Sequence, residues 1–328
     1  MIKNYFNQLI GAVGSTWNRF WFTSSDPLTL CVIRILTGIV AIIYHLSHSW
    51  DLTRWFGLHG LLPIDTVHRL TGAANDSVFD QQFVVAHISL LNQFDDVANL
   101  WTVHIFGLVI LLAFTLGLWT RITTILSLTV ILTYIHRAPM ITGHVEPILS
   151  MLLLYLCIAP CGTYLSLDHI RARKKQSVTT EIPSSISATV SMRFIQVHLA
   201  ALYFIMAMSK LAGDTWWAGE AVWWLIARSE TRLIDLTFLS DLPAYYVVNA
   251  WTHLIVFFEL SFALLVWYRI ARPLLLGIAL LMWTTLALLT GALLFCLAMM
   301  VANLVFVQST TWRRYLNNPL DSPTTLAT

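Results

Sequence analysis

Charged residues are scarce in this chain, and this scarcity is the first constraint on its fold. Only 11% of the 328 residues are Asp, Glu, Lys or Arg, whereas 57% are hydrophobic. Soluble domains carry about 25% charged residues, so these few charges cannot build the water-facing surface of so long a chain. A net charge of +2 gives no indication of nucleic-acid binding. The composition excludes a soluble globular domain and leaves lipid as the solvent.

Cysteine is also rare. The chain has four, at Cys31, Cys157, Cys161 and Cys296, and no pair is placed for a disulfide bond. Cys157 and Cys161 share a helix face, but two ligands do not make a closed zinc site. Small residues that pack inside a bundle are the alternative interpretation. We therefore predict no metal site.

Long apolar segments are what the chain has in abundance. About twenty apolar residues form one span, and we place about eight spans at residues 28–48, 99–119, 122–138, 143–165, 191–211, 246–267, 273–290 and 292–308. Only Gly291 separates the last two, whose summed length is near twice a span, so we predict a tight helical hairpin there. The sequence predicts an all-α, polytopic integral membrane bundle.

Three regions follow from this pattern. Residues 1–24 are amphipathic and lack the long apolar core of a signal peptide, which predicts an interfacial helix. Residues 25–310 form the transmembrane domain, and residues 311–328 form a tail. A polar linker at residues 168–191 divides the spans into two groups of four.

Basic residues predict the orientation. Short segments rich in Lys and Arg stay in the cytoplasm, and one topology puts all of these segments on that side: Lys3, Arg19, Arg121, Arg171, Arg173, Lys174, Lys175, Arg269, Arg272, Arg313 and Arg314. Both termini are then cytoplasmic, and the longer loops at residues 49–98 and 212–245 face outward. We expect a multi-pass protein of the cell membrane, with lipid as its surroundings.

Two ionisable residues fall inside predicted spans, where charge is costly. Arg34 and Glu259 come to similar depth from the cytoplasmic side at 1.5 Å per residue. We predict a structural ion pair between them; a role in binding substrate is the alternative.

The histidines are concentrated on the predicted outer side. His45, His48 and Asp51 are spaced so that they lie roughly on one helix face, a pattern that can hold a metal ion. Capping of helix ends at the interface is the other interpretation. Such a group of imidazoles is also suited to proton transfer.

Lys210 ends an otherwise apolar span, in the stretch Tyr203-Phe-Ile-Met-Ala-Met-Ser-Lys210-Leu, and Asp214, Trp216 and Trp217 follow. One interpretation is a lysine that extends to the outer interface. The other is a desolvated amine that acts as a general base.

This stretch resembles the vitamin K-dependent γ-glutamyl carboxylases and their bacterial relatives, the HTTM domain proteins. That family carries Tyr-Phe-Ile, a lysine pair and Leu, then Asp, Trp and Gly; here Ser209 replaces the first lysine of the pair and Lys210 matches the second. Weaker matches, in the same order, are Arg34, Phe56–Pro63, Gly117–Arg121, Ala159–Gly162, Leu165–Asp168 and Glu259–Phe262.

The resemblance implies an HTTM-type bundle over residues 25–310 in a bacterial inner membrane. It implies that Lys210 deprotonates a reduced quinone such as vitamin K hydroquinone, and that His144 takes the place of the family's functional histidine. The animal carboxylases engage protein substrates with a large C-terminal domain; we expect no such domain, and no carboxylation of protein glutamate, in this case. Two functions therefore stay open: a membrane enzyme acting at the outer face on a quinone-like or peptide substrate, or a non-enzymatic maturation or export factor for a secreted peptide.

The orientation can be tested with an impermeant thiol reagent on intact cells. We expect labelling of Asp235→Cys, in an outer loop, and protection of Ser177→Cys, in the linker. The opposite labelling pattern would invert the topology.

Overall fold

The computed structural model describes residues 2–57, 60–63, 66–67, 89–93, 96–175, 184–227 and 245–316. Within these ranges the regular secondary structure is helical, and β pairing is limited to an isolated bridge between Ser25 and Ser185. The predicted all-α class is confirmed. Ser177 and Asp235, as well as residues 317–328 of the predicted tail, lie outside the described residues.

The helices follow one another along the chain as α1 (Ile2–Phe22), α2 (Leu28–Ser47), α3 (Leu52–Phe56), η2 (Leu90–Gln93), α5 (Val97–Leu116), α6 (Thr120–Arg137), η3 (Pro139–Ile141), α7 (Val145–Ile158), α8 (Leu167–Lys175), α9 (Ile186–Leu211), α10 (Asp214–Trp217), α11 (Ala221–Ile226), α12 (Tyr245–Leu265), α13 (Ala271–Thr290), α14 (Leu293–Asn303), η5 (Leu304–Phe306) and α15 (Ser309–Leu316).

Helices occupy all eight predicted span positions, but they differ in length. Among the described helices, α2, α5, α9, α12 and α13 are long and apolar enough to cross a membrane. Helix α14 with η5 and α15 makes a sixth candidate, bent by 105°. Helix α7 has only 14 residues, because Pro160 follows its end and disfavours helix in the residue before it. The chain is thus a multi-pass membrane protein with five or six full-length candidate spans.

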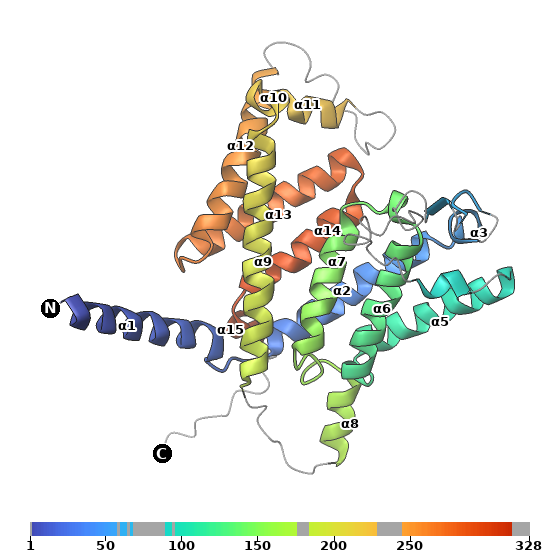
Figure 1. Ribbon diagram of the computed structural model, residues 1–328, viewed down its shortest axis with the longest axis horizontal. Coiled ribbons are helices and arrows are strands. Elements are labelled where there is room, and N and C mark those ends of the chain that lie inside the picture. The colour runs from blue at the N-terminus through green and yellow to red at the C-terminus, as the bar shows by residue number, and fades with distance from the viewer. Residues whose placement is uncertain are drawn as a thin grey trace, which may run out of the picture.

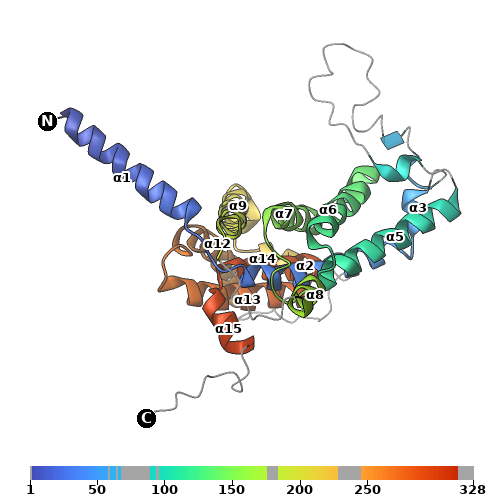
Figure 2. The same cartoon turned by 90° about the horizontal axis from the view of Figure 1, so that it is seen from below.

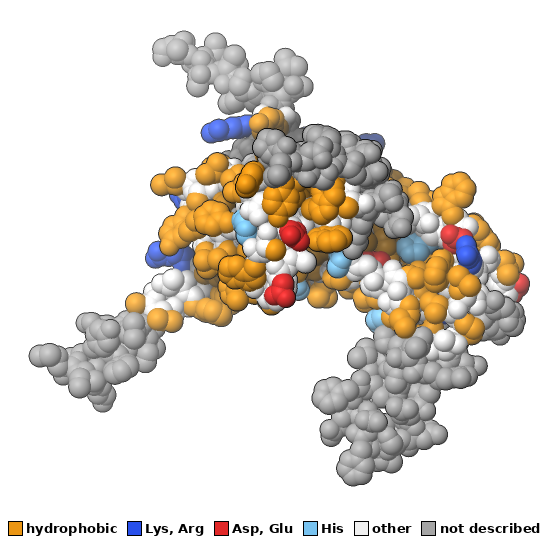
Figure 3. Space-filling model, turned by 90° about the horizontal axis from the view of Figure 1, so that it is seen from above, with side chains coloured by type: hydrophobic (Ala, Val, Ile, Leu, Met, Phe, Trp, Pro, Cys, Tyr) orange, Lys and Arg blue, Asp and Glu red, His pale blue; other side chains and the backbone are white. Residues whose placement is uncertain are grey.

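The surface of the bundle supports a lipid environment. Large apolar side chains are widely exposed, including Phe257 at 69%, Leu281 at 67% and Phe106 at 63% of their full area. Figure 3 shows hydrophobic side chains over most of one face, with few charges among them. Soluble monomers rarely expose apolar patches this extensive, so these side chains are expected to face lipid.

The predicted hairpin at Gly291 is confirmed. Helix α13 ends at Thr290 and α14 begins at Leu293, and the two pack against each other. Gly291 adopts the left-handed conformation at φ 67°, which only glycine adopts without strain.

Helix α1 stands apart from the bundle. Figures 1 and 2 show it running out from the base of α9, across the direction of that helix, with the N-terminus far from the other helices. Its last turns meet α9, where Trp21 lies 5.2 Å from the ring of Phe194. The predicted linker is shorter than expected, because α8 takes Leu167–Lys175 and α9 already begins at Ile186.

The predicted ion pair between Arg34 and Glu259 is wrong. Arg34 is fully buried and donates from Nη1 to the carbonyl oxygen of Cys161 at 2.7 Å and from Nη2 to that of Leu165 at 2.6 Å. Glu259 accepts hydrogen bonds from Lys210 instead. The similar predicted depth of Arg34 and Glu259 did not reveal that the loop after α7 packs against α2. Carbonyl groups of this loop accept the hydrogen bonds of Arg34.

The first turn of α8, directly after this loop, holds the end of α5 and the start of α6. The carboxylate of Asp168 accepts hydrogen bonds from the backbone N–H groups of Trp119 at 2.9 Å and Thr120 at 2.8 Å. Gly117, at φ 73°, leaves no room for a side chain because a Cβ there would meet Ser166 and Arg34. Several motifs that carry the family resemblance are therefore in contact with one another around Arg34. We call this contact region the structural joint; it contains Arg34, Gly117–Thr120, Cys161 and Leu165–Asp168.

We predict that Arg34→Gln lowers the free energy of unfolding by about 3 kcal/mol or more, because two charge-assisted hydrogen bonds are lost inside the bundle. Thermal unfolding in detergent measures this, and Arg121→Gln, at an exposed arginine, is the control. Since Arg34 and Glu259 have separate partners, the losses of Arg34→Gln and Glu259→Gln should add to within about 0.5 kcal/mol. A loss in the double variant that is clearly smaller than the sum of the two single losses would support the predicted pair after all.

Candidate functional site

A buried ion pair joins α9 to α12. Lys210 Nζ donates to both carboxylate oxygens of Glu259, at 2.7 Å and 2.8 Å. The side chain of Glu259 is 1% exposed and that of Lys210 is 16% exposed. The amine therefore does not extend freely to the interface, as one interpretation of the sequence had it; the carboxylate holds it inside.

Helical periodicity brings the two residues together. Tyr203, Ala207 and Lys210 lie on one face of α9, and the first two are buried completely. On α12, Glu259 and Phe262 lie on the facing side, where the ring of Phe262 packs 4.2 Å from that of Tyr203. Residues three and four apart share a helix face. The packing of Tyr203 against Phe262 therefore fixes the register of α9 against α12 at which Lys210 meets Glu259.

A pocket of about 230 Å³ opens beside the ion pair. We call it the Lys210 pocket; it is lined by Lys210, Leu211, Trp216, Trp217, His253, Val256, Phe257 and Leu260. Lys210 Nζ lies 5.2 Å from the ring centre of Trp216, within the range of a cation–π interaction. Phe257 and Trp217 are 69% and 65% exposed, which places the mouth of the pocket on the outside of the bundle.

Helices α10 and α11 close the end of the bundle beyond this pocket, as Figure 1 shows. Asn249 Nδ2 donates to the carbonyl oxygen of Ala218 at 3.0 Å, and Thr252 Oγ1 donates to that of Gly219 at 3.1 Å. Gly219 has φ 75°, and a side chain there would collide with Asn249. Glu259 therefore lies four turns into α12, below the segment that α10 and α11 cover.

A separate group of buried hydrogen bonds joins α9 to α13 and α14, about two turns before Lys210 on α9. Trp283 Nε1 donates to the hydroxyl oxygen of Tyr203 at 2.7 Å, and Asn303 Nδ2 donates to it at 2.9 Å. All three side chains are buried. Tyr203 is the first residue of the family-like stretch, and its hydroxyl joins three helices beneath the pocket.

His144 lies apart from Lys210 in the described contacts. It precedes α7, is exposed, and its ring lies 5.6 Å from Phe295 on α14. The histidine that lines the pocket is His253. His253, Val256, Phe257 and Leu260 follow helical spacing on α12 and share a face next to that of Glu259. This spacing groups the four residues, but it does not show that their face turns toward α9 and α10.

Most of the other outer histidines in the described chain gather between α2, α5 and α6. His45 Nε2 donates to the carbonyl oxygen of His104 at 2.9 Å, and the two rings stack at 4.1 Å. His104 Nδ1 and the Tyr134 hydroxyl share a hydrogen bond of 2.7 Å. Asp51 belongs elsewhere, since it pairs with Arg54 at 3.7 Å on the exposed surface. In the described part of the chain, no group of three or more His, Cys, Asp or Glu side chains is placed to hold a metal ion.

No family model matches this chain, and no curated protein or solved structure matches it. The resemblance to the carboxylases and HTTM proteins therefore stays a prediction. What the site around Lys210 can do is therefore inferred from its own residues and contacts.

We predict strong coupling between Lys210 and Glu259. Lys210→Met and Glu259→Gln each leave a buried polar group without its partner, which costs about 3–5 kcal/mol for a buried ion pair. The double variant should lose clearly less than the sum of the two, as measured by thermal unfolding in detergent.

The exposed pair of Arg54 and Asp51 is the matched control, because its side chains are 64% and 52% exposed. Exposed pairs contribute about 0–1 kcal/mol, so its coupling should be near zero. Equal coupling in the two pairs would mean that Lys210 and Glu259 are solvated.

Proposed function

We propose that this chain is a membrane enzyme that takes a quinone-like compound from the lipid into the Lys210 pocket and uses Lys210 as the base. The observation that carries the proposal is the position of the lysine: Lys210 lines an apolar, aromatic-rich pocket that opens on the outside of the bundle, and Glu259 holds its amine. A compound dissolved in the bilayer can reach such a mouth without crossing water.

The shape and lining of the pocket suit an aromatic ring with a polar end. Trp216, Trp217 and Phe257 offer ring faces and edges, and aromatic pairs prefer offset or edge-to-face contacts. The titratable side chains of the lining are His253 and Lys210, and the lysine can meet a ring hydroxyl. Ligand pockets are mostly apolar with a few polar groups that fix orientation, and this lining follows that pattern.

The ion pair gives the base a route to its neutral form. If a proton moves from Lys210 Nζ to Glu259, the ammonium and carboxylate become an amine and a carboxylic acid, with no change in net charge. The amine then takes the proton of a substrate O–H, and the resulting ammonium is paired with the substrate oxyanion. The pocket holds one positive and one negative charge before and after, which avoids an unpaired charge inside the bundle.

The position of His253 makes it the histidine that can assist. It lines the same pocket as Lys210, and an imidazole can relay a proton between the pocket and the outer surface. His144, which the family resemblance implies, does not line the pocket; its ring lies 5.6 Å from that of Phe295, which in turn lies 5.3 Å from that of Trp283. We assign His253 the relay and His144 a supporting position.

We further propose that the Lys210 pocket lies toward the outer side of the membrane and that both termini are cytoplasmic. Arg193 lies near the start of α9, whereas Lys210 lies at the end of that helix, and Arg269 and Arg272 line the same pocket as Arg193 after the end of α12. The positive-inside rule assigns the end with these arginines to the cytoplasm.

Substitution of Lys210 tests the enzymatic role. Lys210→Arg keeps a positive charge that can pair with Glu259, but arginine does not supply a neutral base near pH 7. We expect Lys210→Arg to unfold near the wild-type temperature, yet to lose as much activity as Lys210→Ala. The assay is oxygen uptake by protein in lipid nanodiscs supplied with a reduced naphthoquinone, because the deprotonated quinol reduces oxygen faster than the neutral quinol.

Ser209→Ala is the neighbouring control, since Ser209 is exposed and its hydroxyl bonds only to the carbonyl of Met206 among the described residues. It should leave oxygen uptake unchanged. Wild-type uptake in Lys210→Arg would remove the enzymatic function and favour the alternative, a non-enzymatic maturation or export factor.

A further inference from the structure

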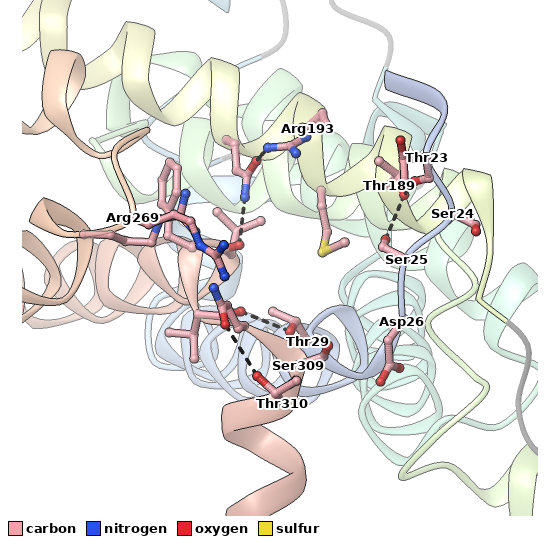
Figure 4. Close-up of a pocket in the computed structure, with 17 residues that line it drawn as sticks. Thr23, Ser24, Ser25, Asp26, Thr29, Thr189, Arg193, Arg269, Ser309 and Thr310 are labelled. Atoms are coloured by element: carbon pink, nitrogen blue, oxygen red, sulfur yellow. Dashed lines mark hydrogen bonds between the residues drawn. The ribbon is translucent and has the colours of Figure 1, made fainter. Parts of the chain in front are cut away.

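A second pocket, of about 410 Å³, lies at the opposite end of the bundle from Lys210. It is lined by the connection from α1 to α2, the start of α2, the first turns of α9, the turn between α12 and α13, and the segment from η5 to α15. Figure 4 shows Arg193 above the open space, Arg269 to one side, and the hydroxyl residues Thr29, Ser309 and Thr310 below it. We call it the arginine pocket.

The positive charge of this pocket is not neutralised by acidic residues of the described chain. Arg193 donates to the carbonyl oxygen of Phe20 at 3.1 Å and to the side-chain oxygen of Gln196 at 2.8 Å, and both are uncharged groups. Arg272 likewise donates to the backbone carbonyl oxygens of Val266 and Trp267. Arg269 forms no hydrogen bond or ion pair with any described residue.

The one acidic residue that lines the pocket is already paired. Asp26 accepts a hydrogen bond of 2.8 Å from Arg313 and another of 3.0 Å from the backbone of Leu28. The arginines in turn repel one another, because Arg193 interacts with Arg272, and Arg272 with Arg269, as like charges. An anion in the pocket would remove this repulsion.

The surroundings indicate the depth at which the pocket lies. Trp17, Phe20, Trp21, Phe194 and Trp267 form a connected aromatic cluster beside it, with ring centres 5.2–6.0 Å apart. Aromatic residues of membrane proteins gather where the hydrocarbon meets the headgroups. The pocket is therefore at the level of lipid phosphates.

A shallow, open apolar depression on α1 begins where the arginine pocket ends. Residues Ala12, Val13, Thr16, Trp17 and Phe20 of α1 line it, with a volume of about 420 Å³. The guanidinium of Arg193 lies 4.3 Å from the ring centre of Phe20, so this contact is the boundary between the two spaces. A lipid with a charged headgroup and an acyl chain matches this arrangement, because the headgroup can lie in the arginine pocket and the acyl chain along the apolar surface of α1.

We propose that the arginine pocket binds a phosphate group, supplied by an anionic phospholipid whose acyl chain lies along α1. Arg193, Arg269 and Arg272 bind the phosphate oxygens, since a guanidinium presents parallel N–H donors that match them. Thr310 and Ser309 add hydroxyl donors at the rim. Bound lipid then ties α1 to the bundle. This site does not depend on the function proposed for Lys210.

The test uses the full-length protein in a neutral detergent, titrated with short-chain phosphatidylglycerol while thermal unfolding is followed. Short-chain phosphatidylcholine, a zwitterionic lipid without net charge, is the control for the lipid charge. Inorganic phosphate tests whether a free phosphate ion binds without a lipid. We expect phosphatidylglycerol to stabilise the wild type, phosphatidylcholine to have little effect, and Arg269→Gln/Arg272→Gln to weaken the lipid affinity about tenfold or more.

Arg121→Gln removes the same charge at an exposed position outside the pocket, and it should keep wild-type affinity. Arg269→Gln alone is a second variant that removes no internal hydrogen bond of the described chain, so it keeps the test valid if the double variant fails to fold. Stabilisation by inorganic phosphate that needs the same arginines would support the phosphate site with a free source. Equal affinity in wild type and Arg269→Gln, or an equal loss in Arg121→Gln, would overturn the proposal.

Discussion

A lysine and a glutamate can stay inside a lipid-embedded helical bundle only if each satisfies the other, and the arrangement around Lys210 depends on this constraint. The 2.7 Å contact with Glu259 fixes the register of α9 against α12. Packing of Tyr203 against Phe262 below the pair enforces the same register. Helices α10 and α11 then cover the pair from the end of the bundle, and the remaining access is sideways, through an aromatic pocket. Burial of the charges and access from lipid are two results of one packing arrangement.

The two ends of the bundle handle charge differently. At the Lys210 end, one positive and one negative side chain are matched and little exposed. At the other end, the arginines around residues 193 and 269–272 outnumber the acidic groups, and backbone carbonyls hold two of them in place. Arg34 uses the same device, because carbonyl groups of the loop after α7 take the place of a carboxylate. Helix ends supply such carbonyls without an acidic partner, so a buried arginine here does not require a buried acid.

Hydropathy predicted the all-α class, the position of each long helix and the hairpin at Gly291, because these depend on local composition. It also singled out Lys210 and Glu259 as residues that need an explanation inside a membrane. It did not pair them, since depth counted along separate helices ignores tilt and the segment of α12 that extends beyond α9. The choice of His253 rather than His144 as the pocket histidine likewise depends on which helix faces meet, and periodicity alone cannot reveal which face of α12 turns toward α9 and α10. The structural joint around Arg34 was missed because its acceptors are backbone atoms, which leave no mark in the sequence.

The central claim is that a lipid-soluble ring compound binds beside the Lys210–Glu259 pair, and photoaffinity labelling tests it most directly. A photoreactive naphthoquinone would be equilibrated with the protein in nanodiscs, cross-linked by light, and located by peptide mass spectrometry. The account predicts cross-links at residues 210–217 and 253–260, the segments that line the Lys210 pocket, and competition by unlabelled quinone. Competed cross-links confined to residues 139–145, next to His144, or to helices that do not line the pocket would contradict it.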